Sequence, residues 1–512
     1  MQRQVDLPAY AGLSMYLGDL HNHCDISYGH GSLEDAYANA ALQLDFASVT
    51  GHASWHDMPR DDPRLAGVVA FHEAGFARLA QCWAEVQELT SAVHEDGRFV
   101  SFLSYEWHSA SAGDRCVYYK AGRGELITPD SLGALHGALR AAAGRGIEML
   151  ALPHHLAYRR GFRGIDWDQF DPAFAPVAEI VSMHGCGESD EGPRPFLHVM
   201  GPRDGESTAA AGLRRGHRFG FIGSTDHHSA HPGSFGYGRA CLWAERLDRD
   251  GLWQALRARR TYAVTGDPIL LATTLNGAPM GAEIPFTSQR SLAVRVRALA
   301  PIDCVEIVRS GRVIARAAPE GRAPVRAGAF SGGAFSGTVP LTLGWGHRRE
   351  RRRWDVAVSV AGGILEGVVA RLRGADIVMP DESPPDRYRV SAWGRDAAGV
   401  WLSTETSGNA NVVTDNTQGL VLRVRGDERT VISLRVNGAT TEHHLGALRA
   451  GALVQYCDGL ESPAVVLGRA VPDEELECDL DLVDEGEGPD WYSVRVRQVN
   501  DQWAWSSPIW VG

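Results

Sequence analysis

The stretch Leu17-Gly18-Asp19-Leu20-His21-Asn22-His23 decides how we interpret the fold, because a short apolar run ends there in two histidines. The same order recurs in the first half of the 512 residues: an apolar run, then a histidine or carboxylate where it ends. The other such runs are residues 46–52, 99–106, 149–155, 180–184 and 221–228. Seventeen of the twenty histidines lie between His21 and His231. This pattern predicts that polar side chains gather where several strands end, as at one mouth of an α/β barrel.

The first 268 residues alternate these strand-like runs with helical patterns. Ser32-Leu33-Glu34-Asp35 is a capping-box-like start for a helix that runs to about Leu44. Apolar residues at helical spacing predict further helices at residues 71–94, 132–143, 208–215 and 252–260. Strands that alternate with helices indicate a parallel sheet, so we expect residues 1–268 to form a barrel of β/α units.

The pattern changes after Gly266-Asp267-Pro268, where helical spacing gives way to short alternating segments such as residues 292–296 and 431–436. Asn276-Gly277 and Asn437-Gly438 are typical of hairpin turns. Residues 269–512 are therefore predicted to be antiparallel β, as a sandwich. No Pro/Gly/Ser spacer separates the two halves, so we expect the β region to pack on the barrel.

Composition excludes several classes of partner. The net charge of −13 argues against nucleic acid or a membrane surface, although a metal site could still attract a small anionic substrate. The sequence has no apolar run long enough for a spanning helix and no secretory signal pattern in its first 16 residues. The eight cysteines show no CxxC pairs, which is typical of reduced thiols. We therefore expect a cytoplasmic protein; the oligomeric state stays open.

The spacing of the strand-end residues predicts metal binding. His21 and His23 are two apart, so their imidazoles share one face of a strand. One such pair is weak evidence, but here Glu106 and then Asp226-x-His228 follow in order after later strands. Nitrogen and oxygen ligands without thiolate suit Zn²⁺, Mn²⁺ or Fe.

The order of these motifs over residues 14–240 resembles the PHP superfamily, named for its polymerase and histidinol phosphatase members. The resemblance implies a distorted (β/α)7 barrel that holds two or three divalent metal ions, with Glu106 bridging two of them. Carried over residue by residue, it assigns one metal to His21, His23, Glu106 and Asp226, a second to Glu106, His154 and His184, and a third to His52 and His228.

The chain departs from the family pattern in two places. The third metal normally needs one more histidine shortly after the first pair, and here His30 or Asp25 must serve. Gly51 precedes His52 where the family has an aspartate. That change concerns a residue that would orient the ligand His52, and not the ligand itself.

A closer resemblance is to a large bacterial family of uncharacterised proteins that combine this barrel with a C-terminal β region. It is carried by residues 102–107, by Glu179-Ile180 with His184-Gly185, by residues 259–266, and by residues 504–511, which read AWSSPIWV. These stretches span nearly the whole chain. They imply the architecture and name no substrate.

The predicted chemistry is hydrolysis. A carboxylate-bridged metal pair can activate water for in-line attack, so no serine or cysteine nucleophile is required. We predict a metal-dependent hydrolase, first of phosphoesters in a small anionic substrate and second of amides, lactones or carboxylic esters. A non-catalytic binding protein with a degenerate barrel is the remaining alternative. The predicted catalytic residues are Glu106, Asp226 and, as a proton donor, His227.

Other polar residues that follow the predicted ligands could contact an anionic substrate, arginine through its planar fork. These candidates are Arg115, Lys120, His155, Arg159, Arg160 and Arg163. The remaining histidines of the first half lack a repeated strand-end context and are interpreted as structural: His56, His72, His94, His108, His136, His198, His217 and His231.

Overall fold

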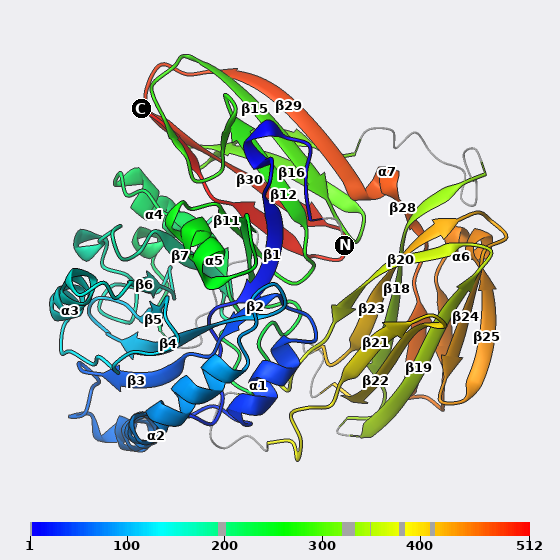
Figure 1. The fold of residues 1–512 in the computed structure, drawn as a ribbon, viewed down its shortest axis with the longest axis horizontal. Helices are drawn as coiled ribbons and strands as arrows, with labels where there is room; N and C mark the ends of the chain where they lie inside the picture. Colours follow the sequence, from blue (N-terminus) through cyan, green and yellow to red (C-terminus); the bar gives the residue numbers. More distant parts are fainter. Residues whose placement is uncertain (1–2, 193–200, 320–332, 349, 378–383, 410–414) are drawn as a thin grey trace.

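The fold consists of an α/β body, a β layer packed on it, and a separate β-sandwich that lies beside helix α1 (Figure 1). The computed structural model describes residues 3–192, 201–319, 333–348, 350–377, 384–409 and 415–512. His198 lies outside these residues. No helix among them has both the length and the hydropathy needed to cross a membrane.

The α/β body contains the five helices that the sequence predicts. They are α1 (Leu33–Ala40), α2 (Ala66–Ala92), α3 (Leu132–Gly144), α4 (Ala209–Arg214) and α5 (Arg249–Arg257). Helix α1 begins at the predicted cap, where the Ser32 hydroxyl accepts a hydrogen bond of 3.1 Å from the Asp35 N–H. Helix α5 begins earlier than predicted because the Asp248 carboxylate caps it, accepting from the Gly251 N–H at 2.6 Å.

The strands of this body are only partly parallel. They are β1 (Ser14–Asp19), β2 (Phe46–Ser48), β3 (Gly51–Trp55), β4 (Val100–His108), β5 (Arg115–Tyr119), β6 (Met149–Pro153), β7 (Val177–Ser182), β8 (Gly185–Cys186), β9 (Gly220–Gly223), β10 (Arg239–Ala244) and β11 (Thr261–Val264). Strands β1, β2 and β4 are parallel, whereas β5 is antiparallel to β4 and β6, and β10 to β1 and β11. The predicted parallel pairing therefore holds for only part of the sheet. Residues 109–114, which join β4 to β5, are too few for a helical crossover.

The pairing of these strands does not close a ring. Strands β7 and β9 are parallel and form a small sheet of their own with β8. They lie beside β6 and β11, but no paired register joins them to those strands within the described residues. The structure thus has a strand-rich mixed α/β body, and the closed (β/α)7 barrel stays a prediction.

The β layer joins the α/β body directly. Its strands are β12 (Leu270–Leu275), β13 (Ala278–Pro279), β14 (Glu283–Ile284), β15 (Gln289–Arg297), β16 (Ile302–Arg309), β17 (Arg312–Ala317), β29 (Glu477–Glu485), β30 (Asp490–Gln498), β31 (Trp503–Ser506) and β32 (Ile509–Val511). Strand β31 pairs with β11, which places Trp505 opposite Ala263. The last strands of the chain therefore extend the sheet of the α/β body across the expected boundary at residue 268.

The sandwich is made of two antiparallel sheets from the middle of the β region. Their strands are β18 (Phe335–Trp345), β19 (Arg351–Ala361), β20 (Ile364–Arg371), β21 (Ala392–Asp396), β22 (Gly399–Ser407), β23 (Gln418–Gly426), β24 (Val431–Val436), β25 (Ala439–His444), β26 (Leu453–Tyr456), β27 (Pro463–Leu467) and β28 (Val471–Pro472), with helices α6 (Leu445–Ala450) and α7 (Asp473–Leu476). Strand β22 alternates as such a sheet requires, burying Val400, Leu402 and Thr404. The prediction of one sandwich for residues 269–512 is corrected accordingly, because the strands at both ends of that region form the β layer.

The three bodies meet at Asp267, whose side chain is fully buried. Its carboxylate accepts two hydrogen bonds from Arg371 at the end of β20, of 2.7 and 2.6 Å. It also accepts from Gln498 at 2.8 Å and from Asn500 at 3.0 Å, both near the C-terminus. A second contact joins the sandwich to the end of α1, where Trp393 Nε1 donates to the Leu42 carbonyl at 2.8 Å.

We expect Asp267→Asn to destabilise the protein at neutral pH by about 3–5 kcal/mol, since it breaks a buried pair and leaves Arg371 uncompensated. Burial alone would raise the pKa of Asp267, but the Arg371 charge and the hydrogen bonds hold it below its ordinary value. The ionised carboxylate therefore stabilises the fold above about pH 4, and this contribution is lost as the pH falls through the lowered pKa. Thermal unfolding of both proteins at pH 7 and below pH 4 tests this. Equal midpoints at pH 7 would contradict it.

Candidate metal centre

Eight of the nine predicted ligands meet in one buried cluster in the α/β body. His21 and His23 follow β1, Glu106 is in β4, and Asp226 and His228 follow β9. The remaining three ligands are His52, His154 and His184. None of the eight residues is more than 7% exposed. The cluster forms because strands distant in sequence lie side by side and end at the same place.

The tightest group joins His21, His23 and one oxygen of Asp226. The two Nε2 atoms lie 3.1 Å apart. Asp226 Oδ1 lies 3.3 Å from His21 Nε2 and 3.0 Å from His23 Nε2. Ligand atoms around a tetrahedral cation with bonds of about 2.1 Å are roughly 3.4 Å apart, so this spacing suits one metal ion.

Glu106 faces imidazoles with both of its oxygens. Its Oε1 lies 2.7 Å from His154 Nε2. Its Oε2 is buried and makes no hydrogen bond within the described residues. Three Nε2 atoms surround that oxygen, those of His52 at 3.3 Å, His23 at 3.6 Å and His21 at 3.9 Å. A buried carboxylate oxygen without a hydrogen bond is costly, and a cation between it and these nitrogens would offset that cost.

The second oxygen of Asp226 lies between two further imidazoles. Its Oδ2 is 3.0 Å from both His155 Nε2 and His184 Nε2. Asp226 and His155 both have positive φ, 53° and 54°, a conformation that side chains other than glycine seldom adopt. The backbone therefore turns sharply at both residues to direct these side chains into the cluster.

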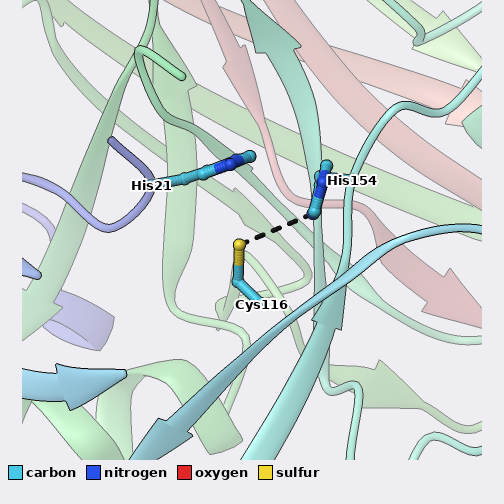
Figure 2. A group of neighbouring side chains, drawn as sticks. All are labelled: His21, Cys116 and His154. Atoms are coloured by element: carbon cyan, nitrogen blue, oxygen red, sulfur yellow. Dashed lines mark hydrogen bonds between the residues drawn. The ribbon is translucent and has the colours of Figure 1, made fainter. Parts of the chain in front are cut away.

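Most of the histidines are oriented through the ring nitrogen that faces away from the cluster. His21 Nδ1 lies 3.0 Å from Glu179 Oε2, and His52 Nδ1 lies 2.9 Å from the Ser27 hydroxyl. His154 Nδ1 lies 3.6 Å from the Cys116 thiol, and Figure 2 shows that contact with His21 alongside. His228 Nδ1 bonds the Asp226 carbonyl at 2.8 Å. A proton held on Nδ1 leaves the Nε2 lone pair free for a metal ion.

The charge states of most ligands in the cluster also suit metal binding. Burial would raise the pKa of Asp226 and of Glu106, but the surrounding histidines hold both pKa values well below the ordinary range, so both are ionised. Burial lowers the pKa of His52, His154 and His228, which keeps these imidazoles neutral. Burial would also lower the pKa of His21, but the charges of Asp226 and Glu179 raise it well above the ordinary value, so His21 would release a proton on binding a metal ion. Ionised carboxylates and neutral imidazoles are the ligand forms of these side chains.

We expect Glu179→Leu to weaken metal binding by about 10–100-fold, the usual effect of removing a residue that orients a ligand. Glu179→Gln, whose amide oxygen can still accept from His21 Nδ1, should keep most of the affinity. Competition with a chromophoric chelator measures both constants. A leucine variant with wild-type affinity would show that His21 needs no such partner.

The third predicted metal group brings His23 together with His52 and His228, and His30 borders it. His23, His52 and His228 offer nitrogens within 4.8 Å of one another, and the rings of His23 and His52 stack at 3.8 Å. The backbone N–H of His30 donates to the His228 carbonyl at 2.8 Å. Asp25, the other candidate, is exposed. The group of His23, His52 and His228 therefore shares His23 with the group of His21, His23 and Asp226.

The structure also explains Gly51. A Cβ added at this position would lie 2.6 Å from the Leu79 side chain of α2. A side chain at position 51 would therefore collide with an apolar contact of this helix.

His108 belongs to the cluster, although we interpreted it as structural. Its Nδ1 lies 3.4 Å from Glu106 Oε1 and 3.4 Å from Asp114 Oδ2. The apolar run predicts a strand that ends before Glu106, whereas β4 continues to His108. Residues 106 and 108 then share a strand face, the same two-residue spacing that identified His21 and His23.

Two of the six predicted substrate-binding residues reach the cluster. They are His155 and Arg163. The Arg163 guanidinium pairs with Asp114 at 2.7 Å and approaches His108 Nδ1 at 3.2 Å. It also lies 5.2 Å from the centre of the Trp55 ring. Its side chain is 12% exposed, so it lies between the buried ligands and solvent.

The other four lie elsewhere. Arg115 neighbours Cys116 on β5 and so points to the opposite face, where it is buried and donates to the Gly113 and Asp114 carbonyls. Lys120 pairs with Glu148 and Asp250 at the opposite ends of the strands. Two residues are exposed: Arg159, beside the Phe162 ring, and Arg160, paired with Asp166 and Asp168.

His227 points toward the sandwich. Its ring lies 3.9 Å from Asp376 and stacks 6.1 Å from the Tyr237 ring. Burial lowers its pKa to about 3, so its imidazole is uncharged at neutral pH. The predicted role of His227 as a proton donor is therefore not supported by its position.

Comparison with known proteins gives limited information. No family model matches the chain. Uncharacterised proteins from Chlamydia muridarum (strain MoPn / Nigg) and Chlamydia pneumoniae are 28% identical over 191 and 183 residues, or 34% and 33% of this chain. These matches cover 30% and 29% of those proteins, so the chain spans less than a third of the length of the curated relatives it matches.

One solved structure is similar along most of the chain. It is the crystal structure of a two-domain protein from Bacteroides vulgatus ATCC 8482 that contains a predicted PHP-like metal-dependent phosphoesterase. It is 11% identical, covers 94% of this chain and 99% of its own, and has a TM-score of 0.30. The assignment of the site therefore depends on the geometry of this chain.

Proposed function

We propose that the protein is a metal-dependent hydrolase of PHP type with a di- or trinuclear centre of Zn²⁺, Mn²⁺ or Fe. The observation that carries this proposal is the convergence of imidazole Nε2 atoms on the carboxylates of Glu106 and Asp226. Most of these imidazoles are held from behind through Nδ1, and the two carboxylates are ionised. A merely structural histidine core would not need so many nitrogens directed at two buried charges.

The residues of the cluster can take different catalytic roles, some binding metal ions and one donating a proton. Cations bound there would lower the pKa of a water molecule and polarise the scissile bond. Glu106 and Asp226 supply the negative charge and, with two oxygens each, reach different parts of the cluster. His155 lies between Asp114 at 3.1 Å and Asp226 at 3.0 Å. Burial lowers its pKa, but these hydrogen bonds raise it above the ordinary value, so His155 is suited to give a proton to a leaving group.

Phosphoesters are the preferred substrate class because Arg163 borders the buried cluster. Its planar guanidinium can bond two oxygens of a phosphate at once. Amide, lactone or carboxylic ester hydrolysis is the second candidate, since the same metal-activated water attacks carbonyl carbon. The substrate would be a small anionic molecule, and we propose that residues 1–268 supply the site.

A substrate screen of metal-loaded protein tests the function. Phosphomonoesters, phosphodiesters, lactones and amides are each supplied with and without a chelator. We expect phosphoester hydrolysis that stops on chelation and returns when metal is added back. Hydrolysis that survives full removal of metal would contradict the proposal, and metal binding without turnover of any class would favour a non-catalytic binding protein.

A further inference from the structure

The segment 372–377, which follows β20 of the sandwich, lies against the loop that carries two predicted metal ligands. That loop, residues 226–237, begins with Asp226 and includes His228. Four hydrogen bonds join the two segments: Phe235 N–H to Leu372 O at 3.0 Å, Gly374 N–H to Ser234 Oγ at 3.2 Å, Ser229 Oγ–H to Ile377 O at 3.1 Å, and Tyr237 O–H to the Asp376 carboxylate.

The closest approach is at Gly374. A Cβ added there would lie 2.5 Å from His227 Cε1 and 2.5 Å from His231 Cβ, which is closer than such atoms can come. Both imidazoles are buried, 1% exposed each, so neither can simply turn out into solvent. The backbone of the sandwich segment is therefore packed directly on the ring that follows Asp226 in sequence.

The loop is also held by hydrogen bonds with Asp19 and His23, on the side of the α/β body. The buried Asp19 carboxylate accepts from the Thr225 N–H at 3.0 Å and from the Gly233 N–H at 2.7 Å. The His227 carbonyl accepts from the His23 N–H at 2.7 Å. The α/β body thus holds the start of the loop and Gly233, whereas Ser229, Ser234, Phe235 and Tyr237 are bonded to segment 372–377.

We propose that segment 372–377 positions the ligand loop, so that the metal centre is complete only when the sandwich is docked. Gly374 is the positioning residue, because only a residue without a side chain allows this approach to His227 and His231. The inference rests on the proposed metal centre and assigns a task to the sandwich. It makes the sandwich a structural part of the site, although none of its described residues belongs to the ligand cluster.

Gly374→Ala tests the proposal in the full chain, with Gly459→Ala as the matched control. Gly459 is in the same sandwich, and an added Cβ there meets nothing within 4 Å. The readouts are the affinity for Zn²⁺ by chelator competition and hydrogen exchange of residues 226–237. We expect Gly374→Ala to lower the affinity about 10–100-fold and to speed exchange of the loop, and the control to change neither.

Tyr237→Phe provides a second test should Gly374→Ala fail to fold. It removes only the hydroxyl that bonds Asp376, and we expect a smaller loss of Zn²⁺ affinity in the same direction. Wild-type affinity and wild-type loop exchange in either folded variant would overturn the inference while leaving the metal centre intact. A wild-type protein that binds none of Zn²⁺, Mn²⁺ and Fe would instead refute the proposed function itself.

Discussion

Glu106→Gln should cause the largest loss of metal and activity of any single substitution. Both oxygens of Glu106 face imidazoles, Oε1 toward His154 and Oε2 toward His21, His23 and His52. Glutamine keeps the shape but removes the charge and replaces one oxygen by an NH₂ that cannot bind a cation. Because one carboxylate serves more than one cation, we expect at least one metal per chain to be lost and hydrolysis to fall by more than about 100-fold.

The matched control is Glu95→Gln, which changes the same functional group at a position whose side chain is 59% exposed and pairs with Arg98. It should retain wild-type metal content and rate. Metal analysis and kinetics on the three proteins decide the matter. A Glu106→Gln variant with full metal content would show that Glu106 is not the bridging ligand.

Arg163→Met should reduce turnover of anionic substrates selectively. Arg163 is the one arginine of the predicted set that both contacts the cluster residues Asp114 and His108 and is partly open to solvent. A lost hydrogen bond to a charged group costs about 1.5–3 kcal/mol, so we expect kcat/KM for a phosphoester to fall roughly 10–100-fold and inhibition by inorganic phosphate to weaken.

Arg159→Met is the control for this change, since Arg159 is in the same loop but exposed. Hydrolysis of a neutral lactone provides the second comparison. If Arg163 binds the anion, the lactone rate should be nearly unchanged. Equal losses on both substrates would mean that Arg163 acts by holding Asp114 and His108 in place, and would remove the main reason for preferring phosphoesters.

The ligand cluster could be predicted from the sequence because its signal is local. An apolar run followed by a polar residue marks the end of a strand, and a two-residue spacing marks a shared face, as at His21 and His23. The same rule identifies His108 once the true end of β4 is known. Where the strand ends depends on its antiparallel pairing with β5, and the sequence does not specify that partner.

The substrate-facing residues were predicted less well because sequence proximity does not fix direction. Arg115 and Cys116 are adjacent, yet they point to opposite faces of β5, and only Cys116 contacts a ligand. His227 and His228 differ in the same way, one facing the sandwich and the other the cluster. Among the loop arginines, Arg163 differs from Arg159 by its position beyond a turn, which no periodic pattern indicates.

The arrangement of the β region depends on contacts between distant parts of the chain. Alternation predicts that residues 431–436 form a strand with one buried face, and β24 buries Ile432 and Leu434 on one face. It cannot predict that Trp505 pairs opposite Ala263, because pairing is set by the complete sheet. The contact of Gly374 with His227 is of the same kind and joins residues that no local pattern connects.

The central claim is that the buried histidines and carboxylates hold metal ions, and the metal content of the purified full chain tests it most directly. The protein is loaded with Zn²⁺ or Mn²⁺, freed of loosely bound ions and subjected to elemental analysis. The geometry around Glu106 and Asp226 predicts two or three ions per chain, lost on treatment with a strong chelator. Less than one ion per chain would contradict the account.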